Sequence, residues 1–309
     1  MSQFQVRKAK RTQRPLKISL EGLSGSGKTY TALRLAFAMR RAGIGKRIVV
    51  ADSENESASL YEGITEDGER WDYEVCSIPA ESQTPNGYAS CYDYLVGQGY
   101  DIIIIDSMTH AWKGALARVD TLAAASRSND KFSIGWKAVS PEQEKMMQTI
   151  TNPKAHVITT TRVKGEFDRV TGGNGKDQWK KIGTKADQRE GMEYEYDAVI
   201  RIDNEEHLAV VEKVRGCIAM DGKSCKRPGP EFFKPLFDWW LSAPETEKIV
   251  PPTVDETIAT INAKLNTATT LPELGAAWQS VQADIARLGE RKDELVKFKD
   301  AKKAQLSAA

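Results

Sequence analysis

The octapeptide at residues 22–29 reads G-L-S-G-S-G-K-T and constrains the fold more than any other part of the chain. It joins glycines to a lysine and a hydroxyl at the spacing of a loop whose backbone N–H groups surround phosphate oxygens. The apolar run at residues 17–21 predicts a strand before it, and the Ala- and Leu-rich residues 29–42 predict a helix after it. Because the helix N-terminus adds positive potential, we expect a nucleotide phosphate site here.

Individual residues of this loop have distinct expected tasks. The backbone around Gly25 to Lys28 is expected to face the phosphates, and the Lys28 side chain to reach the β and γ phosphates. The hydroxyl of Thr29 is expected to bind Mg²⁺, since this small hard cation prefers oxygen ligands. The expected cofactors are therefore ATP and Mg²⁺. The predicted nucleotide-binding residues are Gly22, Ser24, Gly25, Ser26, Gly27, Lys28, Thr29 and Tyr30.

Short apolar runs separated by helical or irregular stretches predict an α/β fold with a mainly parallel sheet. The run Ile102–Ile105 is apolar at every position, as expected for a central strand with both faces buried. Asp106 follows it and is predicted to be the acid beside the magnesium ion, with a helix N-cap as the alternative. The predicted strands are 17–21, 47–51, 102–105, 156–160 and 198–202, with 208–212 as an edge hairpin.

Helix signals and composition divide the rest of the chain. Ser140 as N-cap, Pro141 at the first helical position and Gln143 as capping-box partner predict a helix that ends at Asn152. The aromatic residues 232–240 are expected to pack on the sheet. The predicted organisation is a basic flexible tail at 1–15, an ATPase core at 16–242, a linker at 243–252 and an all-α module at 253–309.

Charge and cysteine usage limit the class of protein. Lys and Arg total 44 against 43 Asp and Glu, a net charge of +1, so any polyanion binding must be local. The four cysteines lack C-x-x-C spacing, which argues against a structural zinc site and a secreted disulfide framework. No apolar stretch approaches the roughly 18 to 20 residues that span a bilayer. We expect a cytoplasmic protein with no membrane partner.

Asp52, Ser53 and Glu54 follow the second predicted strand, where their spacing alone suits either a catalytic carboxylate or a solvated acidic loop. With Asp106-Ser107, this D-S-E block resembles the RecA-like ATPases. The resemblance implies that Glu54 activates water and that Asp106 is the Walker B carboxylate. It also shows a departure, because Thr160 stands where that family has a glutamine that senses the γ-phosphate.

The residues Lys213-Val214-Arg215-Gly216 form a further block of the same resemblance. From the residues alone they are an exposed strand end with two cations. The resemblance implies that Lys213 and Arg215 enter the ATP site of a neighbouring subunit, which predicts a ring or filament of this chain. The predicted catalytic residues are Glu54, Lys28, Lys213 and Arg215.

Residues 164–191 occupy the place of the second DNA-binding loop in RecA-like proteins. Flexible backbone, the aromatic ring of Trp179 and several cations suit single-stranded DNA, although interspersed acids leave a mobile loop with no DNA role as the alternative. The candidate DNA-binding residues are Lys164, Arg169, Lys176, Trp179, Lys180, Lys181 and Lys185.

Over residues 16–242 the chain is most similar to phage-encoded RecA-like single-strand annealing ATPases, a group of AAA-family ATP-binding proteins. This resemblance implies an ATPase that binds single-stranded DNA during annealing or strand exchange, with the helical module as a docking site for a protein partner. A P-loop kinase of a small molecule and a nucleotide-driven switch or motor acting on a protein are the alternatives. Steep salt dependence of binding would favour DNA over a protein partner.

Overall fold

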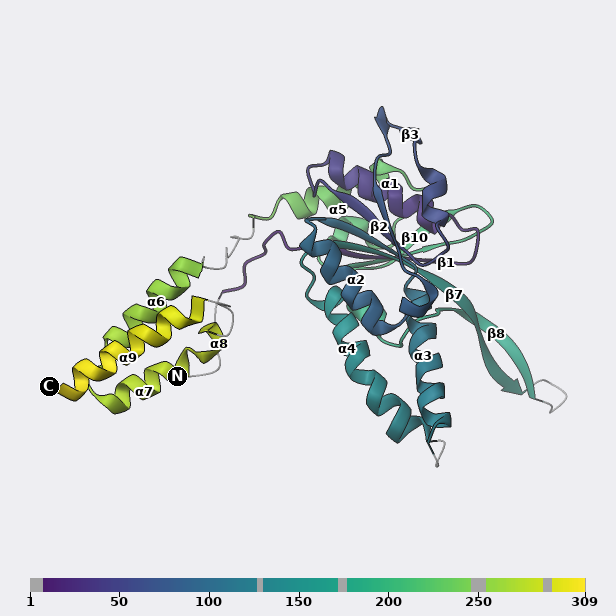
Figure 1. The fold of residues 1–309 in the computed structure, drawn as a ribbon. Coiled ribbons are helices and arrows are strands. Elements are labelled where there is room, and N and C mark those ends of the chain that lie inside the picture. Colours follow the sequence, from purple (N-terminus) through teal and green to yellow (C-terminus); the bar gives the residue numbers. More distant parts are fainter. Residues whose placement is uncertain (1–7, 127–129, 172–176, 246–253, 286–290, 309) are drawn as a thin grey trace. The chain divides into compact units, whose positions relative to one another are not determined.

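The computed structural model describes the chain apart from residues 1–7, 127–129, 172–176, 246–253, 286–290 and 309 (Figure 1). The described chain forms two compact units, residues 1–246 and residues 247–309. The first holds a mixed α/β core and the second only helices. The predicted α/β core with a mainly parallel sheet and a helical C-terminal module is therefore confirmed.

A mainly parallel sheet is the centre of the first unit, in the order β11-β10-β9-β1-β7-β6-β2-β5. The strands from β9 to β5 run parallel, while β10 and β11 are antiparallel additions at one edge. The predicted central strand lies between β7 and β2, as expected from its isoleucines. The strands are β1 Lys17–Gly22, β2 Ile48–Asp52, β5 Glu74–Ser77, β6 Ile102–Asp106, β7 His156–Thr171, β9 Ala198–Ile202, β10 Leu208–Val214 and β11 Ser224–Lys226.

Helices cover both faces of this sheet (Figure 1). Along β6, Ile102 and Ile104 join the apolar cluster under α1 and α5, whereas Ile103 and Ile105 join the cluster under α2 and α3. This alternation follows from the two-residue period of a strand. The helices are α1 Lys28–Arg41, α2 Pro85–Gly97, α3 Met108–Ala124, α4 Lys137–Thr151 and α5 Pro230–Leu241; short elements are η1 Ser57–Tyr61, β3 Thr65–Glu66, β4 Glu69–Arg70, η2 Ala80–Ser82, η3 Lys131–Trp136, η4 Met192–Tyr194 and η5 Ile218–Met220.

The start of α4 differs from its prediction. The helix begins at Lys137, not after Ser140, and Pro141 lies inside it. The preceding π-helical turn ends at Trp136, whose ring stacks on Trp112 of α3 with centroids 5.8 Å apart. This packing extends the helix backward past the local N-cap signal, since tertiary contacts override propensity.

An antiparallel arm replaces the flexible loop expected after the fourth parallel strand. Beyond the sheet, β7 pairs with β8 (Asp177–Ala186), from Val163 opposite Ala186 to Thr171 opposite Asp177. Figure 1 shows these two strands projecting away from the body of the core. The glycines of residues 172–175 are as typical of a hairpin turn between two strands as of a flexible loop.

Part of the expected N-terminal tail is held on the core. The Arg11 guanidinium donates to Ser242 Oγ at 2.7 Å, and the Trp240 indole N–H donates to the Arg14 carbonyl at 2.7 Å. Arg14 also pairs with Asp197 at 2.9 Å. The segment around residues 11–14 therefore lies along the C-terminal end of α5.

The second unit contains α6 Val254–Asn266, α7 Leu271–Ser280, α8 Gln282–Ile285 and α9 Lys292–Ala308. Its own apolar cluster includes Ile261, Leu265, Leu274 and Leu295. Thr270 and the Glu273 side chain form a capping box at the start of α7. In the described part of the chain, no helix combines the length and apolarity that crossing a membrane requires.

Candidate nucleotide site

The loop at residues 22–29 has the backbone geometry of a phosphate cradle. It leaves β1 at Gly22 and enters α1 at Lys28. Gly25 and Gly27 have φ values of 77° and 85°, in the left-handed region that favours glycine. A Cβ on Gly22 would lie 2.4 Å from Ser26 Oγ, so this close turn also excludes a side chain. The first N–H groups of α1 are left for an anion.

Lys28 lies among the other charged residues predicted for the site. Its Nζ donates to the Leu23 carbonyl at 2.8 Å, within the loop. Burial lowers the pKa of Lys28, while the carboxylates of Asp106 and Glu54 raise it and Arg162 lowers it. Residues that are far apart in the sequence therefore lie close enough to Lys28 to affect its charge.

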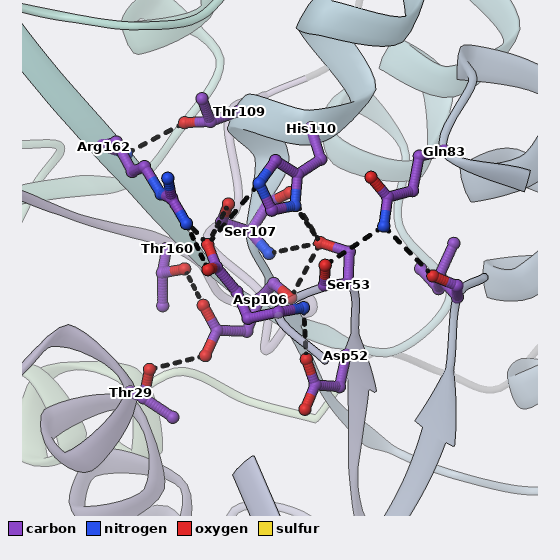
Figure 2. Close-up of polar contacts among 12 residues, drawn as sticks. Thr29, Asp52, Ser53, Gln83, Asp106, Ser107, Thr109, His110, Thr160 and Arg162 are labelled. Carbon is purple, nitrogen blue, oxygen red and sulfur yellow. Dashed lines mark hydrogen bonds and ion pairs between the residues drawn. The ribbon is translucent and has the colours of Figure 1, made fainter. Parts of the chain in front are cut away.

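Asp106 ends β6 and is held by two threonine hydroxyls, as Figure 2 shows. Thr29 Oγ1 donates to Asp106 Oδ2 at 2.6 Å, and Thr160 Oγ1 donates to Oδ1. Burial raises the pKa of Asp106, against these two donors, which lower it. The adjacent hydroxyl and carboxylate oxygens of Thr29 and Asp106 suit a small hard cation such as Mg²⁺.

Glu54 lies just beyond β2, in a turn held by its neighbour Asp52. The Asp52 carboxylate accepts the backbone N–H of Glu54 at 2.5 Å and that of Ala58 at 3.0 Å. The Glu54 carboxylate accepts Ser107 Oγ at 3.0 Å and Arg162 Nε at 3.1 Å. Burial would raise the pKa of Glu54, but the hydrogen bonds from Arg162 and Ser107 outweigh it and lower the pKa.

A buried polar network joins the ends of β2 and β6 behind these carboxylates (Figure 2). Ser53 Oγ donates to the Asp106 carbonyl at 3.0 Å and accepts the Ser107 N–H at 2.9 Å. It also lies 2.9 Å from His110 Nδ1, and His110 Nε2 is 3.9 Å from Glu54 Oε1. Sequence reasoning did not assign these contacts, although serines after acids at two adjacent strand ends were a visible signal.

A cavity of about 490 Å³ adjoins the phosphate loop. His207 Nδ1 lies 3.1 Å from the Ser26 carbonyl, and the Arg34 guanidinium donates to the Arg227 carbonyl at 3.0 Å. Tyr30 was predicted to be part of the nucleotide site. His207 and Arg227 were not, because they are far from the phosphate loop in the sequence and lie beside it only in the folded chain. The lining residues are Ser26, Gly27, Tyr30, Thr31, Arg34, His207 and Arg227.

Lys213 and Arg215 lie at the opposite end of the sheet from the phosphate loop. Val214 pairs with Ala198 at the start of β9, whereas the loop follows the end of β1. Lys213 Nζ donates to the Tyr196 carbonyl at 3.0 Å. Arg215 donates to the Tyr194 carbonyl. The length of the sheet therefore separates these two cations from the nucleotide site of the same chain.

The candidate DNA-binding residues divide by what the structure describes. Lys164 and Lys185 are exposed at the base of the arm, where they pair with Asp187 at 2.9 Å and Glu190 at 3.1 Å. Lys176 lies outside the described residues. The side chains of four further candidates also lie outside the described part: Arg169, Trp179, Lys180 and Lys181.

The parallel α/β core and the loop-and-carboxylate site define a P-loop ATPase. The chain belongs to the AAA-domain family, which matches residues 14–227. The signal recognition particle 54 kDa protein of Staphylothermus marinus is 32% identical over 95 residues, 31% of this chain. The chain spans only 21% of that relative's length. The KaiC-like protein PH0186 of Pyrococcus horikoshii is 15% identical, with a TM-score of 0.31, over 69% of this chain and 90% of that one.

Proposed function

We propose that this protein is a Mg²⁺-dependent ATPase that binds single-stranded DNA and promotes annealing or strand exchange in phage recombination. The observation that carries the ATPase assignment is the meeting of Glu54 and Asp106, from two neighbouring strand ends, with Lys28 and Thr29 of the phosphate loop. Parallel strands direct their carboxyl ends to one edge of a sheet, which is where ligands bind in such folds.

The site residues divide the reaction among them. The loop backbone and Lys28 hold the phosphates, and the cavity beside Tyr30 has room for the base and sugar. Thr29 and Asp106 would hold Mg²⁺, which would neutralise charge on the phosphates. Glu54 orients the attacking water and accepts its proton. The water oxygen bonds to the γ-phosphorus as the bond to the β,γ-bridging oxygen breaks, and ADP leaves.

Assembly with further copies is part of the proposal. Lys213 and Arg215 cannot complete their own site across the sheet, so a neighbour's site is the one that they would reach. Beside Arg215, a cavity of about 410 Å³ is also lined by the cations Lys10, Arg11 and Arg14. Such a face suits the anionic phosphates of a nucleotide bound to an adjoining subunit.

Single-stranded DNA is the proposed polymer partner, and the β7–β8 arm is its proposed site. Support comes from its projection beyond the core and from the cations and Trp179 in its sequence. Cations that track phosphates and a ring on which bases stack are what such binding requires. The helical unit at 253–309 is proposed to bind a protein partner.

One experiment tests the proposed ATPase and its partner together. ATP turnover is measured for wild type, Glu54→Gln and the control Glu142→Gln, with and without single-stranded DNA at two salt concentrations. Glu142 pairs with Arg118 between α3 and α4, outside the nucleotide site. We expect Glu54→Gln to bind ATP but lose turnover, and DNA to stimulate the wild type less at higher salt.

Other outcomes separate the alternatives. Equal turnover in Glu54→Gln and wild type would remove Glu54 as the base. ATP consumption that requires a small-molecule hydroxyl acceptor, without response to DNA, would identify a kinase. Turnover that responds to a protein and not to DNA would identify a protein-directed switch or motor.

A further inference from the structure

Two of the four cysteines, Cys76 and Cys91, lie against each other in the core unit. Their Sγ atoms are 3.7 Å apart, although the residues belong to different elements, β5 and α2. Both residues are half-buried. We infer that this pair, the β5–α2 dithiol, is a modification site at which a small-molecule disulfide such as oxidised glutathione converts two thiols into one intramolecular disulfide.

The fold keeps these two sulfurs together. β5 is the end strand of the sheet, and Cys76 pairs there with Ala51 of β2. Tyr88, Tyr92 and Leu95 bury one side of α2 in the apolar cluster on this face of the sheet, and both cysteines pack against the same cluster. The thiols therefore meet through the packing of two elements, not through closeness in the sequence.

The two thiols differ in reactivity. Burial, and then the neighbouring Cys76, raise the pKa of Cys91 to about 12. The thiolate is the nucleophile in disulfide exchange, so that Cys91 is a poor attacking group while it keeps its proton. Cys76 lies on the end strand and is therefore the sulfur that reacts first with an incoming disulfide. Cys91 is placed to resolve the product.

The exchange takes two steps in which atoms and electrons balance. The Cys76 thiolate attacks one sulfur of oxidised glutathione, and a mixed disulfide forms as one glutathione thiolate leaves. The Cys91 sulfur then attacks Cys76 Sγ, and the second glutathione leaves. The protons of the two cysteines end on the two glutathione thiols. Two protein thiols are thus oxidised by two electrons, and one small-molecule disulfide is reduced.

The bond would tether two elements that support the nucleotide site. Beside Cys76, Ser77 pairs with Asp52 at the end of β2. On α2, Tyr88 lies one turn before Cys91, and its hydroxyl donates to the Ser107 carbonyl at 2.9 Å. A disulfide that closes this short loop restricts the unfolded chain and so stabilises the folded one. In a reducing compartment such a bond is transient, so that the stabilisation is reversible.

The test treats the full chain with oxidised glutathione and identifies the thiols that remain. Cys217 and Cys225 lie outside β5 and α2 and are internal controls. Alkylation in denaturant should leave Cys76 and Cys91 unlabelled, and peptide mapping without reductant should show them linked to each other. The melting temperature of the oxidised chain should rise by about 5 °C and return to its starting value on reduction.

Single substitutions separate the tasks of the two sulfurs. In Cys91→Ser, Cys76 should retain a bound glutathione, because no second thiol displaces it. In Cys76→Ser, Cys91 should stay a free thiol. Cys225→Ser is the matched control and should form the bond as wild type does.

Three results in wild type would overturn the inference: both thiols stay free, Cys76 keeps its glutathione, or the bond joins separate chains. None of these depends on ATP turnover or on DNA, so that the proposed function would be unaffected. An oxidised chain that melts at the same temperature as the reduced one would overturn the stabilising tether between β5 and α2.

Discussion

At the scale of single residues, Thr160 has a task other than the one its position in the sequence suggested. It stands where RecA-like proteins have a sensing glutamine, yet its buried hydroxyl donates to Asp106. Thr160→Val keeps the shape and removes this donor. We expect the free energy of unfolding to fall by about 1–3 kcal/mol, because the bond is made to a buried carboxylate. We also expect ATP turnover to require more Mg²⁺, since Asp106 loses a positioning contact.

Thr161→Val is the matched control, because Thr161 is equally buried but lies 3.5 Å from a neutral acceptor, Gln188 Oε1. Chemical denaturation and turnover across a Mg²⁺ series measure the two effects. Equal losses in both variants would mean that the hydroxyl of Thr160 has no special relation to Asp106.

The places of residues in the candidate site were predictable from the sequence where one local pattern contains them, whereas their roles stay predictions. Lys28 and Thr29 lie in the phosphate loop, and Asp106 directly follows its run of isoleucines. The contacts of Arg162 and His207 were not predictable, because each depends on the register of strands distant in the sequence. A spacing pattern names the chemical groups but not which of them pair in the folded chain.

At the scale of elements, a buried histidine joins β1 to β7. His156 begins β7, and its Nδ1 accepts the Leu16 N–H at 3.0 Å. Burial lowers the pKa of His156 from 6.5 to about 4, against the opposing effect of Asp101. Between these two values the unfolded chain binds a proton that the folded chain does not. The free energy of unfolding therefore has its full value from this group above pH 6.5, and it falls as pH decreases toward 4.

We expect the wild type to lose roughly 2 kcal/mol of unfolding free energy between pH 6.5 and pH 5 through His156 alone. His156→Gln keeps an acceptor for the Leu16 N–H and cannot titrate. The variant should therefore lose less unfolding free energy than the wild type between pH 6.5 and pH 5, by the same roughly 2 kcal/mol. Urea denaturation at the two pH values measures both. The same loss in variant and wild type would assign the acid sensitivity to other groups.

The packing of α3 against the start of α2 depends on a glycine. A Cβ at Gly114 would lie 1.8 Å from the Gln83 carbonyl oxygen, so Gly114→Ala must separate the two elements. We expect a loss of about 1–3 kcal/mol in unfolding free energy. Gly97 in α2 has nothing within 4 Å of the same position, and Gly97→Ala should be neutral or stabilising by up to about 1 kcal/mol. Thermal denaturation should distinguish the two variants. Equal melting temperatures would contradict the close approach of Gly114 to the Gln83 carbonyl.

Elements were predictable where burial dominates the local pattern. The parallel strands follow from apolar runs, and the β6 isoleucines indicated a central position. The start of α4 was not predictable, because the stacking of Trp136 on Trp112 outweighs the cap signal at Ser140. The arm was missed for a related reason, since glycine-rich residues between two cation-bearing segments fit both a loop and a hairpin turn.

At the scale of the whole molecule, the phosphate loop and the Lys213–Arg215 pair lie at opposite ends of the sheet in the ATPase core. The phosphate loop follows the end of β1, while Lys213 and Arg215 are placed at the end where β9 begins. An assembly that stacks one end of a subunit on the other end of the next repeats the same interface. Such head-to-tail contact produces a ring when it closes and a filament when it does not.

This arrangement makes two inactive variants complementary. Lys28→Ala removes the lysine expected to bind phosphate, and Arg215→Ala removes the cation that is proposed to reach a neighbour's site. In a mixed assembly, the intact loop of an Arg215→Ala subunit can meet the intact Arg215 of a Lys28→Ala subunit. Random equal mixing creates that pairing at one interface in four, so that recovery up to roughly a quarter of wild-type ATP turnover is expected. Mixing Lys28→Ala with the Lys28→Ala, Arg215→Ala double variant creates no such interface and should recover nothing. A verified mixed assembly without recovery would show that Arg215 does not act across subunits.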